Sequence, residues 1–457
     1  MKKELITFKS KNNHNYFYDP LLKEIFIYSE DLYQKRDSIC KNNSEEETTY
    51  MSITAKDVEY QLANMGQITI EMTEKCNLNC LYCAYGNLYS NVHREGVDIK
   101  FSLIKNILVY LVEKLNSNLN ASANKPFYIS FYGGEPTIAF DYIKKTVDFA
   151  KNLIFLNNRV IFSMTTNGFF LDKYMDYFKE NNFRLLISLD GDRKGNRLRV
   201  DHNGKTQFNK IFSNIKLLQS KYPDYFKNNV NFNAVLNKYN SVESITDFIE
   251  KNFKNLPKIS DINSQGLNPE KISEFYNIYS SSLKSFEEAE KIMNIKEKYF
   301  IHHPIIKDSF LFLRSVCNNS FIDYNSLLVE KNKTRIPTGT CLPFFKRMFV
   351  SANGIILPCE NVSHDNPFGY VNEKGVHIDT EKIAAIYNNA FKQLSNQCKK
   401  CYGKEICSEC IFQMEKKFEC TQVVKKNDLK EKFSRAMTLI ENNPELYSRM
   451  MKEVCVE

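Results

Sequence analysis

Hydrophobic and polar positions follow two different periods along residues 66–265. Short apolar runs predict β-strands at residues 67–72, 127–132, 160–165, 184–189, 230–236 and 258–262. Longer stretches with helical spacing separate them, at residues 102–115, 140–156, 171–180, 208–219 and 242–253. Alternating strands and helices favour a parallel sheet with right-handed crossovers. We therefore expect an α/β fold, a partial (β/α)6 barrel of the TIM type rather than a full eight-stranded barrel.

The regions on both sides of this barrel have other patterns. Residues 1–65 predict two short strands around Asp19-Pro20 and a helix near residues 55–64. They form a small α+β appendage, which is either a scaffold extension or a peptide-recognition element. Residues 266–335 are helical in pattern and link the barrel to residues 336–424, where cysteine-rich short strands and turns are expected. Residues 425–457 predict a polar helical tail.

Residues suited to chemistry follow four of the predicted strands. These residues are Cys76, Cys80 and Cys83 after the first strand, Gly133-Gly134-Glu135-Pro136 after the second, Thr165-Thr166-Asn167-Gly168 after the third and Asp190-Gly191 after the fourth. Glycine is scarce, at 15 of 457 residues, so its concentration in these loops is informative. The active site of an α/β barrel lies at the carboxyl ends of its strands. The four loops therefore predict one site.

The first of these loops has the cysteine spacing C-x3-C-x2-C. Three thiolates this close can bind a cubic iron–sulfur cluster, and no fourth cysteine is near in sequence to complete its four iron ligands. One iron is then left open, which favours chemistry over electron storage. The alternative is a three-cysteine zinc site completed by a distant histidine.

Composition narrows the class of protein. Hydrophobic residues make up 43% of the chain, and the net charge of +8 is spread without a basic cluster, so neither nucleic acid nor a membrane is an expected partner. No apolar run is long enough to span a membrane, and the first residues lack a signal-peptide core. We expect a cytoplasmic protein, in which thirteen cysteines indicate metal or cluster binding rather than disulfides.

Seven of the cysteines fall within residues 341–420. They are Cys341, Cys359, Cys398, Cys401, Cys407, Cys410 and Cys420. Seven thiolates are too many for one site and nearly enough for two. Paired C-x2-C knuckles also bind zinc, but only five residues separate these two pairs, fewer than a zinc ribbon uses.

Together these motifs resemble a known family. The cysteine triplet, with Tyr82 before its last cysteine, resembles the signature of radical S-adenosylmethionine (radical SAM) enzymes, and Gly133-Gly134-Glu135-Pro136 resembles their second motif. The cysteine-rich end resembles the auxiliary-cluster domain called SPASM. Within the superfamily, the chain is similar to bacterial peptide maturases associated with short double-glycine leader peptides.

The resemblance implies the cofactors and their contacts. It implies S-adenosyl-L-methionine (SAM) on the open iron of a 4Fe–4S cluster, whose electron cleaves the sulfonium to a 5′-deoxyadenosyl radical. The residues that the resemblance implies around SAM are Tyr82, Gly133, Gly134, Glu135, Thr166, Asn167, Ser188, Asp190, Arg199 and Leu236. Arg199 would bind the carboxylate, with Arg197 as its competitor. Asp190 either binds the ribose or structures its own turn.

The resemblance also implies two auxiliary 4Fe–4S clusters. One would use Cys398, Cys401, Cys407 and Cys420. The other would use Cys341, Cys359 and Cys410, with either Cys317 or a vacancy in the fourth position.

The implied activity is oxidative maturation of a ribosomally synthesised peptide. Hydrogen abstraction would lead to a thioether, carbon–carbon or carbon–heteroatom crosslink, with a flavodoxin or ferredoxin as reductant. One alternative is a sulfatase-type maturase that makes formylglycine. Another, from a different class, is a non-catalytic peptide-binding partner of a modifying complex.

Overall fold

The computed structural model describes residues 4–42, 52–90, 94–122, 124–291, 294–317, 338–414 and 418–453. They form two compact units, each built from separate stretches of sequence. The larger unit comprises residues 54–293 and 341–385, and the smaller comprises residues 1–53, 294–340 and 386–457. These two units differ from the five consecutive segments expected from the sequence. The domain boundaries of those five segments stay a prediction.

The larger unit is built on one ten-stranded sheet, in the order β13-β12-β11-β10-β4-β5-β6-β7-β8-β9. Its strands β4 to β9 are all parallel neighbours, as predicted. Their bounds are Gln67–Thr73, Lys125–Gly133, Asn158–Thr166, Arg184–Ser188, Val230–Val235 and Lys258–Ser260. The predicted partial (β/α)6 barrel is therefore confirmed.

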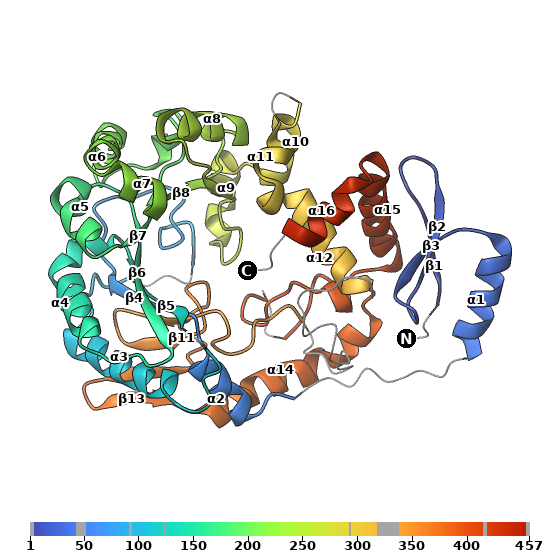
Figure 1. The fold of residues 1–457 in the computed structure, drawn as a ribbon, viewed down its shortest axis with the longest axis horizontal. Coiled ribbons are helices and arrows are strands. Elements are labelled where there is room, and N and C mark those ends of the chain that lie inside the picture. Colours follow the sequence, from blue (N-terminus) through green and yellow to red (C-terminus); the bar gives the residue numbers. More distant parts are fainter. Residues whose placement is uncertain are drawn as a thin grey trace. The chain divides into compact units, whose positions relative to one another are not determined.

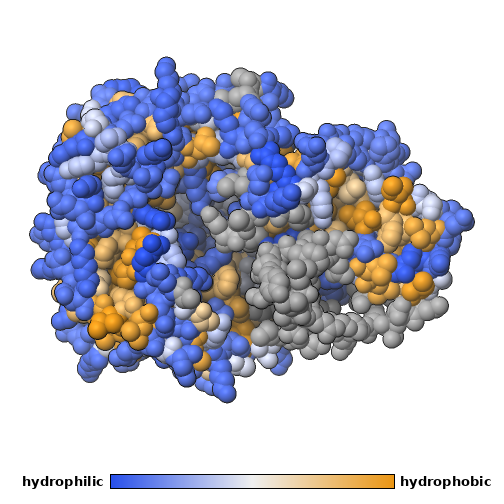
Figure 2. Space-filling model, viewed as in Figure 1, coloured by the Kyte–Doolittle hydropathy of each residue, from blue (hydrophilic) through white to orange (hydrophobic). Residues whose placement is uncertain are grey.

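Helices connect these strands and lie in an arc outside them (Figure 1). They are α3 (Phe101–Leu115), α4 (Phe140–Lys151), α5 (Leu171–Glu180), α6 (Phe208–Lys221), α7 (Pro223–Asn229) and α8 (Val242–Phe253). All of them except the short α7 bury an apolar stripe; in α5 it consists of Leu171, Met175 and Phe178. The opposite faces are mostly hydrophilic where Figure 2 shows this arc. The predicted helix at residues 140–156 ends earlier, at Lys151, and α7 was not predicted.

Strands from the cysteine-rich region extend the barrel sheet. They are β10 (Met348–Val350), β11 (Ile355–Leu357), β12 (Gly369–Asn372) and β13 (Gly375–Ile378). β10 lies parallel to β4, with Met348 opposite Ile68, and β10 to β13 are antiparallel to one another. The turn between β10 and β11 requires Gly354, which has a φ of +80° and whose Cβ would lie 2.3 Å from the Val371 oxygen. Short strands were expected here, but their union with the barrel was not.

Three further helices belong to the larger unit. They are α2 (Ala55–Ala63), α9 (Ile272–Ile278) and α10 (Ser282–Ala289). Thr54 caps α2 by accepting the Asp57 N–H, and the Asp57 carboxylate accepts the Thr54 N–H in return. The helix expected near residues 55–64 is therefore confirmed.

The smaller unit carries a three-stranded sheet packed on helices. Its strands are β1 (Ile6–Lys9), β2 (Asn15–Asp19) and β3 (Glu24–Ile27), of which the sequence predicted the last two. Its helices include α1 (Glu30–Asn42), α11 (Ile295–Lys298), α12 (Pro304–Val316), α15 (Lys426–Asn442) and α16 (Glu445–Glu453). The rings of Phe8, Tyr18 and Phe312 pack around the fully buried Phe433 of α15. The expected polar helical tail is thus α15 and α16, whose apolar side chains join this core.

One long helix was missed altogether. Helix α14 spans Thr380–Lys400, in a region where only short strands and turns were expected. Its apolar residues recur at helical spacing, with Ile383, Tyr387, Ala390 and Leu394 buried. Its last turn contains Cys398, the first cysteine of the clustered run, so the cysteine pattern overlaps the helical one.

Candidate active site

A cavity of about 410 Å³ opens at the carboxyl ends of the barrel strands. Cys76, Cys80 and Cys83 line it, as do residues from the loops after β5, β6 and β7. The residues predicted around SAM that line it are Tyr82, Gly133, Gly134, Glu135, Thr166, Asn167, Ser188 and Arg199. The structure thus brings the four motif-bearing loops to one place, except that Asp190 and Leu236 do not line the cavity. Val235, one residue before Leu236, does.

The cysteine loop is held by backbone hydrogen bonds to residues 198–200, a segment far away in sequence. The Asn79 N–H donates to the Val200 oxygen at 2.7 Å, and the Leu81 N–H donates to the Leu198 oxygen at 3.0 Å. Within the loop, the Leu78 N–H donates to Cys76 Sγ at 3.4 Å. The loop therefore has a fixed backbone that presents its three sulfurs to the same cavity.

Burial disfavours free thiolates in this loop. It raises the pKa of the Cys76 thiol to about 12 and that of Cys80 to about 11. Cluster ligands are thiolates, so only a bound cationic centre would compensate for this desolvation. The donor set and its burial therefore fit an iron–sulfur cluster.

The two glycines of the second motif lie against the base of the cysteine loop. A Cβ on Gly133 would lie 2.3 Å from the Thr73 oxygen, and one on Gly134 would lie 2.2 Å from the Lys75 oxygen. Gly133 also has a φ of +142°, which side chains rarely adopt. The Gly134 and Glu135 N–H groups donate to the Thr73 and Lys75 oxygens, each at 2.9 Å. Glycine is required here because two backbones meet, and both glycines line the cavity.

Glu135 joins the second motif to the third. Its Oε1 accepts hydrogen bonds from the Thr137 hydroxyl at 2.5 Å and from the Thr166 hydroxyl at 2.8 Å, and its Oε2 accepts the Asn167 N–H at 2.7 Å. The side chain is 1% exposed, and burial raises the pKa of its carboxyl. The Asn167 side chain continues the network by donating to Asn77 Oδ1 at 2.8 Å, within the cysteine loop.

Tyr82, Asp190 and Arg199 form a buried triad. The Tyr82 hydroxyl donates to Asp190 Oδ2 and accepts from Arg199 Nη1, the latter at 2.9 Å. Asp190 Oδ1 accepts the Val235 N–H at 2.9 Å, so both of its oxygens have partners within the protein. This arrangement favours the structural role for Asp190 over a ribose contact.

Arg199 lines the cavity and, within the part of the chain that the structure describes, has one buried nitrogen without a hydrogen-bond partner. It is 7% exposed, and its Nε has no partner among the described residues. The competitor Arg197 is exposed and stacks over the Tyr239 ring at 4.4 Å. An unpaired buried guanidinium nitrogen is unfavourable unless a ligand accepts its hydrogen. Arg199 as the carboxylate-binding residue, with Arg197 as its competitor, stays a prediction.

Several residues of the cavity were not predicted. They include Glu74, Tyr85, Arg94, Tyr132, His202 and residues 261–263. Tyr132 ends a strand next to the glycine motif, which was a usable signal. Arg94 and His202 lie in irregular loops, where neither periodicity nor spacing marks them.

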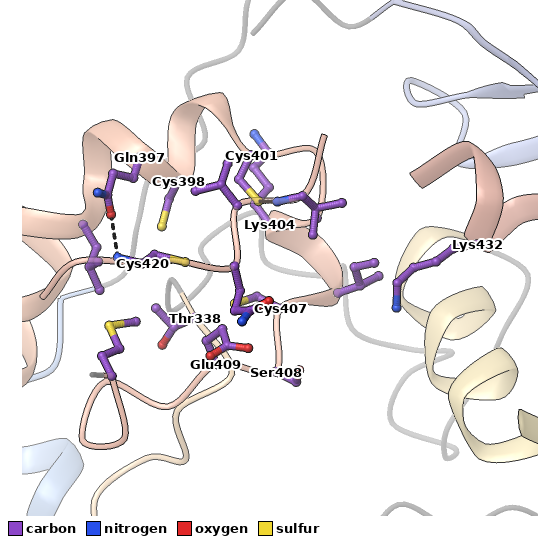
Figure 3. Close-up of a pocket in the computed structure, with 17 residues that line it drawn as sticks. Thr338, Gln397, Cys398, Cys401, Lys404, Cys407, Ser408, Glu409, Cys420 and Lys432 are labelled. Carbon is purple, nitrogen blue, oxygen red and sulfur yellow. Dashed lines mark hydrogen bonds between the residues drawn. The ribbon is translucent and has the colours of Figure 1, made fainter. Parts of the chain in front are cut away.

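A second cavity, of about 230 Å³, lies in the smaller unit (Figure 3). Cys398, Cys401, Cys407 and Cys420 line it together, which is the set expected for one auxiliary cluster. Cys420 is held by its N–H, which donates to Gln397 Oε1 at 2.9 Å, as the dashed line shows. Cys401 Sγ accepts the Val424 N–H at 3.3 Å.

The other C-terminal cysteines are distributed differently. Cys410 does not line the second cavity. Cys341 and Cys359 belong to the larger unit, and Cys317 and Cys410 to the smaller. Cys317 follows α12 and packs against the core around Phe433, where burial raises the pKa of its thiol to about 11. A cluster shared by these four cysteines stays a prediction.

In the part of the chain that the structure describes, no three cysteine, histidine or acidic side chains converge closely enough to hold one metal ion. The two cysteine sets lie instead around cavities. A four-iron cube binds its thiolates at separate corners, so its ligands need not converge on a single point.

Comparison with known proteins decides the class. A family model described as the radical SAM superfamily matches residues 70–251, which contain the cysteine triplet and all the strand-end motifs. Residues 70–251 are a radical SAM domain. Its cofactors are therefore S-adenosylmethionine and a 4Fe–4S cluster. Because the chain carries this domain, it is an enzyme. The alternative of a non-catalytic peptide-binding partner is therefore excluded.

Two curated relatives cover most of this chain. One is the cysteine-type anaerobic sulfatase-maturating enzyme of Clostridium novyi, 28% identical over 73% of this chain and 84% of that protein. Another is the radical SAM cyclopropyl synthase TigE of Paramaledivibacter caminithermalis, 22% identical over 77% of this chain and 69% of that protein.

Solved structures show the same fold. A structure titled "Native anSMEcpe with bound AdoMet" has a TM-score of 0.53 and 19% identity, and the match covers 84% of this chain and 99% of that one. This likeness concerns the fold. None of the helices in the described part of the radical SAM enzyme is both long and apolar enough to cross a membrane.

Proposed function

We propose that this radical SAM enzyme is a maturase that crosslinks a ribosomally synthesised peptide. The observation that carries the proposal is the single cavity that joins Cys76, Cys80 and Cys83 to the glycine motif and Arg199. The relatedness to sulfatase maturases and to a cyclopropyl synthase supports a polypeptide or a peptide-derived substrate.

The residues present fit the two cofactors. Cys76, Cys80 and Cys83 would hold the cluster, and Arg199, which lines the same cavity, would bind the carboxylate of the methionine moiety. When bound, the cofactors supply a carbon radical strong enough to abstract hydrogen. The Gly133 and Gly134 backbone allows close approach, and the Glu135 network fixes Thr166 and Asn167 at the cavity wall.

An auxiliary 4Fe–4S cluster of the SPASM type is proposed at Cys398, Cys401, Cys407 and Cys420. Four thiolates around one cavity are a complete ligand set, which suits electron transfer rather than substrate binding. A second auxiliary cluster at Cys341, Cys359 and Cys410, with Cys317 as a candidate fourth ligand, would complete the cofactor set. The reductant would be a flavodoxin or ferredoxin.

The N-terminal strands are proposed to recognise the precursor peptide. β3 is the last strand of its sheet, and no described strand pairs with its outer edge. Ile27 on this strand is 77% exposed. An unpaired strand edge with an exposed apolar residue can bind an extended peptide as an additional strand. An Ile27→Lys variant should then bind a long precursor more weakly and process a leaderless core peptide unchanged.

The sulfatase-type alternative is favoured by one observation, the relatedness to the Clostridium novyi maturase. The two functions give different products. A crosslink removes a pair of hydrogens and leaves the chain intact, whereas formylglycine carries an aldehyde.

Co-expression with a short peptide encoded beside the enzyme tests the proposal. Mass spectrometry of the peptide should show the loss of a hydrogen pair without reactivity toward a hydrazide. The matched control is the Cys80→Ala variant, which should leave the peptide unmodified. A hydrazide-reactive product would establish the sulfatase-type activity instead, and an unmodified peptide with active enzyme would rule out this substrate.

A further inference from the structure

A network of charged side chains lies beside the cysteine loop, outside the motifs discussed above. Glu71 of β4 is buried, with its side chain 3% exposed, and its Oε1 lies 2.7 Å from Arg94 Nη2. Its other oxygen, Oε2, accepts the Ala352 N–H at 3.0 Å, in the turn between β10 and β11. One carboxylate therefore bridges the barrel, the loop that carries Arg94 and the hairpin that leads to Cys359.

Arg94 contacts both ends of the cysteine loop. Its Nη1 donates to the Glu74 oxygen at 2.8 Å, two residues before Cys76. Its guanidinium carbon lies 3.5 Å from the centre of the Tyr85 ring, two residues after Cys83. A planar guanidinium can make this fork and stack simultaneously, and a lysine ammonium cannot.

Glu74 strengthens the same junction. Its Oε2 accepts the Glu95 N–H at 2.8 Å and the Val97 N–H at 3.2 Å, and its Oε1 lies 3.4 Å from Asn353 Nδ2. The loop after the cysteines and the β10–β11 turn are thus tied to the same two acidic residues of the β4 end.

Arg94 lines the active-site cavity, so a direct contact with substrate was the obvious role. Its contacts argue against that role. Both terminal nitrogens already donate within the protein, and one face of the guanidinium is covered by Tyr85. A guanidinium with these partners positions its neighbours and has little capacity left for a ligand.

We propose that Arg94 is a positioning residue, which together with Glu71 locks the cysteine loop onto the β10–β11 hairpin and so sets where the catalytic cluster sits relative to S-adenosylmethionine. The proposal rests on the cluster site at Cys76, Cys80 and Cys83 and is independent of the peptide that is modified. Replacing residues that orient metal ligands from outside the coordination shell typically lowers metal affinity or activity roughly 10- to 100-fold.

The test uses the full-length enzyme with its clusters, purified without oxygen, and no peptide. The readouts are iron content, the electron paramagnetic resonance spectrum of the dithionite-reduced cluster, and the change in that spectrum when S-adenosylmethionine is added. Arg94→Gln should weaken the cofactor-induced spectral change, so that about 10- to 100-fold more cofactor is needed. Arg94→Lys should restore the cofactor-induced spectral change only in part. Lysine restores the positive charge, but it cannot make both hydrogen bonds and stack on the Tyr85 ring.

Two further variants keep the proposal falsifiable if Arg94→Gln folds poorly. Tyr85→Leu removes the stack and leaves the ion pair, and Glu71→Gln weakens the pair and leaves the stack. Both should shift the cofactor titration in the same direction, and the double variant Glu71→Gln/Arg94→Gln should fall short of the summed effects, because the residues act as one unit. The matched control is Lys100→Gln, which removes an exposed ion pair with Glu373 in the same unit and should change nothing.

Two results would overturn the proposal. One is a wild-type cofactor titration and spectrum in both Arg94→Gln and Tyr85→Leu. The other is a double variant Glu71→Gln/Arg94→Gln whose effect on the cofactor titration equals the sum of the two single effects, which would mean that the two residues do not act together. Neither depends on which product the enzyme makes, so failure here is distinguishable from failure of the proposed peptide crosslinking.

Discussion

The carboxylate of Glu135 accepts the backbone N–H of Asn167 at 2.7 Å. This bond joins the loops after β5 and β6 at the cavity wall. Because the Glu135 oxygens accept from three residues, the side chain organises the site from within. A glutamate that the motif suggests as a cofactor contact is thus also the residue that fixes the positions of its neighbours.

Replacing Glu135 by Gln should therefore weaken cofactor binding. The amide nitrogen cannot accept a hydrogen bond, so at least one donor among Thr166, Thr137 and Asn167 is left unpaired, at about 1–3 kcal/mol. Equilibrium binding of S-adenosylmethionine and the apparent melting temperature should both fall. Thr166→Val, which removes one bond, should have a smaller effect in both assays, and an equal or larger one would contradict the network.

The same carboxyl predicts a pH dependence of stability. Burial raises the folded-state pKa of Glu135 above its ordinary value of 4.5, so the folded state binds a proton more tightly than the unfolded state. This stabilising contribution is present at low pH and is lost as the pH rises through the folded-state pKa. The difference in melting temperature between the wild type and Glu135→Gln should shrink over that interval. A difference that grows with pH would show that the pKa is lowered instead.

Two glycine variants should separate steric clash from backbone strain. Gly133→Ala places a Cβ 2.3 Å from the Thr73 oxygen at a φ of +142°, and should abolish cofactor binding. Gly375→Ala has a similar φ of +139° with no atom within 4 Å of the new Cβ, and should lose only about 1 kcal/mol of stability. Similar losses from both variants would mean that strain, rather than contact with the cysteine loop, makes Gly133 necessary.

Tyr82→Phe should impair the enzyme more than its small change in volume suggests. The variant removes the hydroxyl that pairs with Asp190 and Arg199, and it leaves a buried carboxylate oxygen without its donor. We expect weaker cofactor binding and a loss of about 1–3 kcal/mol in stability.

Arg199→Lys should raise the KM for S-adenosylmethionine with little change in stability. If Tyr82→Phe binds the cofactor normally, Arg199 does not depend on the triad.

Loss of Cys398 should remove one auxiliary cluster while the catalytic site survives. Cys398→Ser enzyme should contain less iron by about one cluster and still cleave S-adenosylmethionine in the presence of dithionite. The matched control is Cys40→Ser. Burial beside Asp19 raises the pKa of the Cys40 thiol to about 11, and its sulfur lies 3.8 Å from Asp19 Oδ1, away from both cavities. Unchanged iron in Cys398→Ser would refute the auxiliary site.

The barrel was predictable because its signals are local. The alternation around Ile68 and Ile70 in β4, and the stripe of Leu171, Met175 and Phe178 in α5, follow directly from strand and helix periods. The cysteine and glycine motifs were equally legible, since each follows a strand within a few residues.

The features that could not be predicted from the sequence depend on contacts between residues far apart in the chain. Met348 of β10 pairs with Ile68 of β4, which lies far earlier in the sequence. The residues around β10 contain no local signal that predicts this partner strand. The bond between Glu71 and the Ala352 N–H is equally remote in sequence. Leu236 was expected at the cavity, but strand alternation turns Val235 toward it instead. Asp190 lay in the right loop, yet its partner Tyr82 could not be known without the fold.

The most direct test measures 5′-deoxyadenosine released from S-adenosylmethionine by anaerobically reconstituted, dithionite-reduced enzyme. The account predicts release by the wild type, none by a Cys76→Ala/Cys80→Ala/Cys83→Ala variant, and continued release by Cys398→Ser. No release by the wild type with a full complement of iron, or equal release by the triple variant, would contradict a catalytic cluster at these three cysteines.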